Sequence, residues 1–108
     1  MLDAMAAPPF EPADLSDKWS PVDAAGAVEL AGELARECPE GHVLYGQEVQ
    51  AVAIRKLRKE LICWLPAQQQ WARVHLTWTQ EQDPRWPTTH LFEAWASLVA
   101  ELVEAGRG

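Results

Sequence analysis

The chain has 108 residues, of which 48% are hydrophobic and 23% are charged, the balance of an ordinary soluble globular domain. Sixteen acidic residues against nine basic ones give a formal net charge of −7. That charge disfavours binding to nucleic acid, because Lys and Arg contacts to phosphates dominate such binding. The length predicts one domain whose core is stable without a disulfide or a bound metal.

No apolar run reaches the roughly 18 residues of a membrane span, and the first ten residues contain no basic segment typical of a secretory signal. We therefore expect a cytoplasmic protein that does not bind membranes. No phosphate-binding loop or dinucleotide motif is present, so we expect no cofactor. Cys38 and Cys63 form no CxxC pattern, and we expect both to be buried, free thiols.

Residues 1–19 contain three of the eight prolines, which exclude a long helix or a central strand. We expect an irregular, proline-rich N-terminal arm there, followed by a single α+β domain over residues 20–108. Ser20 and Pro21 predict the start of a helix, with Ser20 as its N-cap and Pro21 at its first position.

The apolar stripe of this first helix continues to Cys38, and its acidic residues, Glu37 among them, fall on the other side. Pro39 ends the helix, because the residue before a proline is pushed out of the α region. Three strand-like runs follow, over residues 48–56, 60–65 and 71–79, and the short segments between them favour hairpins.

Thr88 or Thr89 predicts the N-cap of a last helix, which has an apolar face and ends at Gly106. The expected fold is therefore α+β, of order α-β-β-β-α. It consists of a three-stranded antiparallel meander with two helices packed on one face, because such a small sheet needs its apolar side covered.

Alternation along the strands separates two faces of the predicted sheet. One face is wholly apolar and should meet the helices: Leu61, Cys63, Leu65, Ala72, Val74, Leu76 and Trp78. The other face carries tryptophan, arginine and histidine over small residues, a composition typical of interface cores: Ala51, Ala53, Ile62, Trp64, Trp71, Arg73, His75 and Thr77. Either the arm covers this outer face with Phe10 and Trp19, or the face binds a partner or a second copy of the chain.

Sites for metal or nucleophilic chemistry are poorly supported. Cys38 and His42 form only one loosely spaced ligand pair, whereas zinc sites usually have two close-spaced pairs. Cys63 and His75 lie on neighbouring predicted strands but face opposite sides of the sheet, which disfavours a thiolate–imidazole pair. We therefore expect no metal site and no catalytic residue.

The turn Gly41–Gly46, with the sequence GHVLYG, carries a histidine and the only tyrosine. Glycines at both ends indicate a special backbone conformation, and binding residues often lie on such turns. Either His42 and Tyr45 take part in binding, or Leu44 and Tyr45 close one end of the core.

Three short segments, GHVLYG, VHLTW at Val74–Trp78 and WP at Trp86–Pro87, resemble the pattern GHxLYG, VHLTW and WP of a group of small uncharacterised bacterial proteins. The resemblance covers residues 40 to 95. It implies a compact bacterial domain, and it brings no assigned activity with it.

Two hypotheses of function follow. The first is a non-enzymatic protein-interaction domain, for example an immunity- or antitoxin-like inhibitor of a basic toxin, that uses the outer sheet face or an acidic helix face. A homodimer through the outer face is a further possibility. The second is a small-ligand-binding protein or small enzyme with a pocket near His42, Tyr45, His75 and Trp86. Together these give the candidate binding residues His42, Tyr45, Trp64, Trp71, Arg73, His75 and Trp86.

Overall fold

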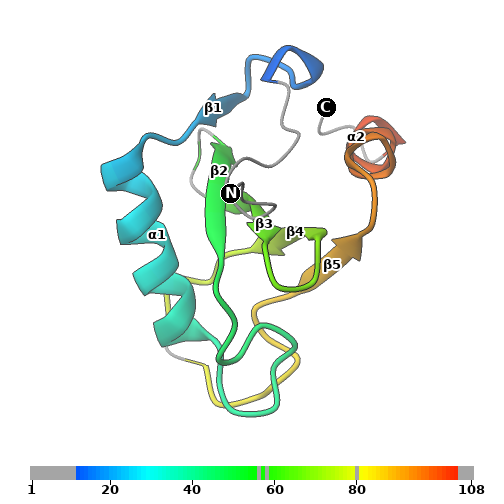
Figure 1. Cartoon of the computed structure of the whole chain (residues 1–108). Coiled ribbons are helices and arrows are strands. Elements are labelled where there is room, and N and C mark those ends of the chain that lie inside the picture. Colours follow the sequence, from blue (N-terminus) through cyan, green and yellow to red (C-terminus); the bar gives the residue numbers. More distant parts are fainter. Residues whose placement is uncertain (1–11, 56, 58, 80, 105–108) are drawn as a thin grey trace, which may run out of the picture.

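The computed structural model describes residues 12–55, 57, 59–79 and 81–104. Its elements in chain order are η1 (Pro12–Asp14), β1 (Trp19–Pro21), α1 (Ala24–Glu37), β2 (Gln50–Arg55), β3 (Glu60–Leu65), β4 (Gln70–His75), β5 (Thr89–Phe92) and α2 (Trp95–Glu104). The strands form one antiparallel sheet in the order β1-β2-β3-β4-β5 (Figure 1). The predicted α+β class is confirmed. Neither described helix is long and apolar enough to cross a bilayer.

The predicted three-stranded meander is wrong in its number of strands, because β1 and β5 extend the sheet at its two edges. β1 contains Pro21, which an edge strand tolerates since one side of it makes no ladder hydrogen bonds. Ser20, the predicted helix cap, pairs instead with Ile54 of β2. β5 occupies residues that the sequence pattern had assigned to the first turn of the last helix.

α1 begins later than predicted. Asp23 is its N-cap, and the Asp23 carboxylate accepts a 2.7 Å hydrogen bond from the backbone N–H of Gly26. The helix ends at Glu37, with Cys38 as C-cap, immediately before Pro39 as predicted. Its buried residues Leu30 and Leu34 pack on the sheet.

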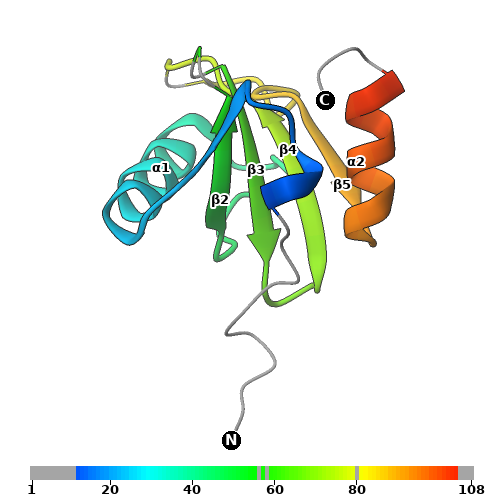
Figure 2. The same ribbon diagram turned by 90° about the horizontal axis from the view of Figure 1, so that it is seen from above.

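The two helices lie on opposite faces of the sheet, so the prediction that they share one face is wrong (Figure 2). Both faces of β3 are apolar and every residue of that strand is buried, which means that each face needs its own cover. The core on the α1 side consists of Leu30, Leu34, Cys38, Leu44, Ala51, Leu61, Cys63, Leu65, Ala72, Val74 and Leu76. The core on the α2 side consists of Trp19, Ala53, Ile62, Trp64, Trp71, Leu98 and Leu102.

Most of the predicted outer face is therefore buried, Trp64, Trp71 and Arg73 included, whereas His75 at the end of β4 is exposed; the alternative in which this face is open to a partner is wrong for the three buried residues. α2 covers them. The Trp71 ring lies 4.9 Å from the Trp64 ring and 4.8 Å from that of Trp95, measured between centroids. Of the arm residues expected to cover this face, Trp19 is buried in the cluster, whereas Phe10 lies outside the described residues.

The η1 segment is joined to α2 by a side-chain contact. The Trp95 indole Nε1 donates a 2.7 Å hydrogen bond to the carboxylate of Asp14. Residues 12–19, from the predicted arm, thus supply both this contact and the first residue of β1.

The predicted alternation of faces is confirmed along β3 and β4 and as far as Leu76, but it fails in the loop that follows. Trp78, assigned to the core from the sequence, is 43% exposed. In β2 a register irregularity between Ala51 and Ala53 places these two residues in different cores.

Candidate functional site

Two loops, one of residues 38–49 and one whose described residues are 76–79 and 81–88, meet beyond the C-terminal end of α1 (Figure 1). His42 joins them. Its Nδ1 accepts a 3.0 Å hydrogen bond from the backbone N–H of Leu44, and its Nε2–H donates a 2.7 Å hydrogen bond to the carbonyl oxygen of Pro87. Both ring nitrogens of this buried histidine are therefore occupied by the backbone, and we assign His42 a bracing role.

Gly41 contributes to the same junction. Its φ of 96° lies in the region that favours glycine, and a Cβ there would approach the Pro84 ring to 3.3 Å. Any other residue at position 41 would be strained in this conformation and would have to displace the Pro84 ring slightly.

A second brace comes from Glu37, the last residue of α1, whose side chain is fully buried. Its Oε1 accepts hydrogen bonds from the backbone N–H and the hydroxyl of Thr77, at 3.0 and 3.1 Å. Its Oε2 accepts a 2.7 Å hydrogen bond from the backbone N–H of Trp78. The carboxylate thus holds the loop after β4 against the end of α1.

Trp78 adopts an unusual backbone conformation, with a φ of 58°. A bulky residue in this left-handed region is a genuine outlier, and such conformations cost about 1–3 kcal/mol each. The hydrogen bond to Glu37 helps to hold this conformation, yet the Trp78 side chain remains 43% exposed. Backbone strain of this kind is concentrated at binding and catalytic sites.

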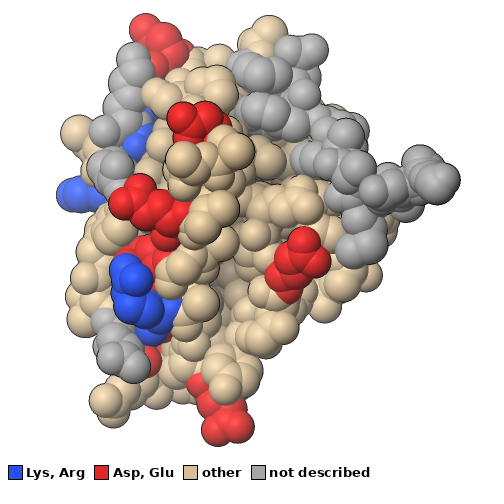
Figure 3. Space-filling model, turned by 60° about the vertical axis from the view of Figure 1, so that its left-hand side comes forward, with Lys and Arg blue, Asp and Glu red and all other residues tan. Residues whose placement is uncertain are grey.

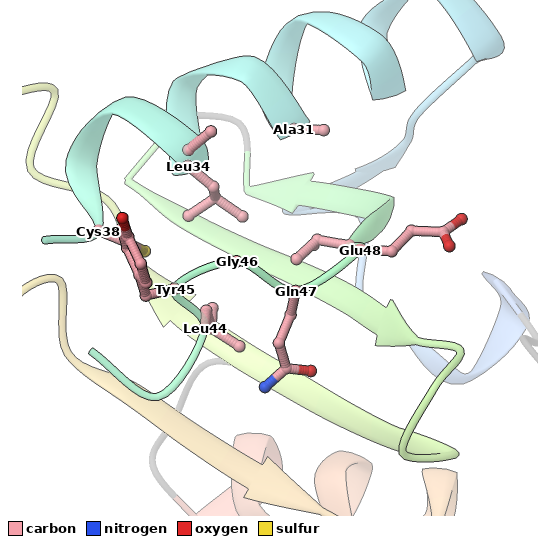
Figure 4. Close-up of a pocket in the computed structure, with 10 residues that line it drawn as sticks. Ala31, Leu34, Cys38, Leu44, Tyr45, Gly46, Gln47 and Glu48 are labelled. Carbon is pink, nitrogen blue, oxygen red and sulfur yellow. The ribbon is translucent and has the colours of Figure 1, made fainter. Parts of the chain in front are cut away.

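A groove lies beside these loops, between α1 and residues 44–49, and Figure 3 shows a hollow lined by uncharged side chains on this side of the molecule. Its volume is about 500 Å³, within the range of small-molecule and side-chain binding pockets. Figure 4 shows Leu34 pointing down from α1 and the Tyr45 ring beside Cys38. The lining residues are Ala31, Leu34, Ala35, Cys38, Leu44, Tyr45, Gly46, Gln47, Glu48 and Val49.

A second hollow of about 540 Å³ continues from the first, because Ala35, Cys38 and Tyr45 line both. We call the two together the α1 groove. The second hollow adds these lining residues: Arg36, Pro39, Glu40, Glu81 and Gln82. Tyr45, at the boundary between the hollows, is 55% exposed.

The α1 groove is apolar at its base and acidic along its edges. Carboxylates come from Glu40, Glu48 and Glu81, whereas Arg36 is the one cation among the described residues that line it. Arg36 forms an ion pair with Glu33 on the same helix. A cleft lined by one sign of charge raises the local concentration of ligands with the opposite charge.

The cysteine in the groove is not an activated nucleophile. Burial and, to a smaller extent, the negative charge of Glu37 raise the pKa of the Cys38 thiol to about 11. Burial also raises the pKa of Cys63, in the core below. Both thiols are therefore protonated at neutral pH, and they serve as small apolar packing groups, buried as predicted.

The four residues of the predicted ligand pocket do not converge. His42 is buried in the brace between the loops, and Tyr45 lines the α1 groove. His75 and Trp86 share a separate pocket with Arg73. Among the described residues no cluster of three or more His, Cys, Asp or Glu side chains could hold a metal ion.

Two residues of this site were not predicted from the sequence. The helical pattern predicts Glu37 on the solvent side of the first helix, and a third strand that runs to residue 79 predicts Trp78 in the core; both predictions are wrong. The partners of Glu37 lie about forty positions further along the chain, so no local pattern could have revealed them.

Comparison of the chain with protein-family models, curated proteins and solved structures finds no match. We therefore infer its function from the geometry of its own residues.

Proposed function

We propose that the protein is a non-enzymatic protein-interaction domain, and that the α1 groove and the neighbouring Trp78 form its contact surface. The observation that carries this proposal is the combination of strain and exposure at Trp78, which has a φ of 58° and is 43% exposed. A residue that served stability alone would have little reason to keep a bulky side chain in this conformation. Tryptophan and tyrosine dominate the binding energy of many protein interfaces, and Tyr45 lies at the groove.

The chemistry of the groove favours a partner with a basic surface and an apolar side chain. The apolar base around Leu34, Cys38 and Leu44 would accept the apolar group. The carboxylates at the edges, together with the formal net charge of −7, would steer a basic protein toward the groove. An immunity- or antitoxin-like inhibitor of a basic protein fits this description.

We further propose a cytoplasmic location. The two unpaired and buried cysteines support it, because thiols stay reduced in that compartment. The Trp64 and Trp71 face is not the proposed partner site, because both rings are buried in the core on the α2 side.

Affinity capture from the source organism with the full chain tests the proposal. The groove variant combines Tyr45→Ala with Trp78→Gly. Its matched control combines Val28→Ala with Leu57→Ala, because both side chains are strongly exposed and apolar but lie outside the groove. Circular dichroism and urea denaturation establish that each variant is folded.

We expect the wild type and the control to retain the same partner, and the groove variant to retain it at least roughly tenfold less well. Retention by the groove variant equal to that of the control would contradict the proposal. If the partner proves to be a second copy of the chain, the groove is the interface of a homodimer. Analytical ultracentrifugation would then show a mass that rises with protein concentration.

A further inference from the structure

A separate pocket opens on the α2 face of the sheet, where β4 meets β5. Its volume is about 310 Å³, and its lining consists of Arg73, His75, Trp86, Thr88 and His90. Arg73 of β4 stands directly opposite His90 of β5, and His75 lies two residues further along β4 on the same face. The two imidazoles are therefore diagonal neighbours on one side of the sheet.

No described carboxylate lines this pocket itself, in contrast to the other hollows described, although Glu60 and Glu101 bond to Arg73 next to it. The two hollows of the α1 groove include Glu48 and the pair Glu40 and Glu81. The hollow at the start of α1 includes Asp23 and Glu29. In a chain with a formal net charge of −7, this pocket instead gathers an arginine and two of the three histidines.

Arg73 lines this pocket, and its side chain is only 8% exposed. Its Nη1 donates to Glu60 at 2.8 Å, and its Nη2 donates to Glu101 at 2.6 Å. Its Nε–H has no acceptor among the described residues. A buried donor without an acceptor is unfavourable, and a ligand oxygen in the pocket would supply one.

We propose that this pocket binds a small molecule through an oxyanion, which is either a carboxylate or a phosphate group. The Arg73 Nε–H, the Thr88 hydroxyl and the imidazoles of His75 and His90 are the donors. Each imidazole offers at least one N–H in either charge state. Trp86, which is 44% exposed, provides a flat apolar wall for the rest of the ligand. This site lies on the opposite face of the sheet from the α1 groove and does not depend on the proposed partner.

Titration of the full chain with inorganic phosphate and, separately, with benzoate tests the proposal. Binding is measured by calorimetry, and its position by the shifts of backbone amide and imidazole signals in NMR spectra. The test variant is His75→Gln with His90→Gln, because both side chains are exposed and their loss should leave the fold intact. Lys18→Gln is the control, since it removes an exposed cation that does not line the pocket.

We expect saturable binding of at least one probe at millimolar concentrations, shifts centred on residues 73–75 and 86–90, and affinity at least roughly tenfold lower in the double histidine variant. A preference for phosphate or for benzoate identifies which oxyanion the pocket selects. Thr88→Val, which keeps the side-chain shape but removes the hydroxyl donor, should weaken binding even if the histidine variant is unstable. Absence of saturable binding of both probes, or equal affinity in the control, the histidine variant and Thr88→Val, would overturn the proposal.

Discussion

The backbone N–H of Trp78 donates a 2.7 Å hydrogen bond to the buried carboxylate of Glu37. This contact joins the last residue of α1 to the loop after β4. It also stabilises the one described tryptophan that has a positive φ. The position of Trp78 at the C-terminal end of α1 therefore depends on a side chain from another element.

Replacing Glu37 should destabilise the fold. Glu37→Gln keeps the shape of the side chain, but its NH₂ group would face a backbone N–H in place of an acceptor. We expect the free energy of unfolding in urea to fall by about 1–3 kcal/mol. Glu29→Gln, an exposed change on the same helix, should alter it by less than about 0.5 kcal/mol. Equal stability of the two variants would show that the Glu37 brace contributes nothing.

Replacing His42 should also destabilise the fold, because His42→Ala leaves the buried N–H of Leu44 and the carbonyl of Pro87 without their partner. We expect a loss of about 1–3 kcal/mol in the free energy of unfolding. His75→Gln provides the comparison, since that imidazole is exposed and its loss should change stability little. A His42→Ala variant as stable as His75→Gln would exclude a bracing role for His42.

The packing of α2 makes a further prediction. Leu98 is fully buried in the α2-side core, so Leu98→Ala should lower the free energy of unfolding by about 2–5 kcal/mol. Val103, on the same helix, is largely exposed, and Val103→Ala should change it by less than about 0.5 kcal/mol. Similar losses of unfolding free energy in the two variants would mean that α2 does not pack on the sheet.

The raised pKa of Cys38 predicts a pH dependence. The folded chain keeps the thiol proton up to about pH 11, whereas the unfolded chain releases it near its usual value of 9.0. The folded state therefore binds more protons in this window, and the stabilisation present below pH 9.0 is lost as the pH rises through about 11. Urea denaturation of the wild type and of Cys38→Ala, at about pH 8 and at about pH 10, isolates this effect. The contributions of the other titratable groups cancel when the unfolding free energies of the two proteins are subtracted. The stability of the wild type relative to Cys38→Ala should be lower at the higher pH, and a difference that does not change with pH would contradict the prediction.

The strands in the middle of the sheet could be predicted from the sequence because their alternation is regular. Leu61 and Cys63 face one core and Ile62 and Trp64 face the other, as expected. Because these side chains are apolar on both faces, the same pattern indicates that an element must pack on the second face as well. The sequence pattern did not show that the cover is α2, since both helices have one apolar stripe and nothing in a stripe specifies a face of the sheet.

The edges of the sheet and the braces of the loops could not be predicted from local patterns. β1 and β5 have three and four residues, too few for periodicity to distinguish a strand from a helix start. The tryptophan of VHLTW was placed in the core because the third strand was continued beyond His75. Tyr45 was identified as a candidate because it lies on a turn between two glycines, which is a local feature.

The unfolding free energy of Trp78→Gly tests most directly whether Trp78 is kept for contact rather than for stability. Glycine adopts a φ of 58° without strain, and relief of the left-handed conformation is worth about 1–2 kcal/mol, which offsets the loss of a half-exposed ring. We predict that Trp78→Gly is as stable as the wild type to within about 1 kcal/mol, or more stable. A loss of more than about 3 kcal/mol would show that the indole is a structural element of the core, and it would contradict the assignment of Trp78 to a binding surface.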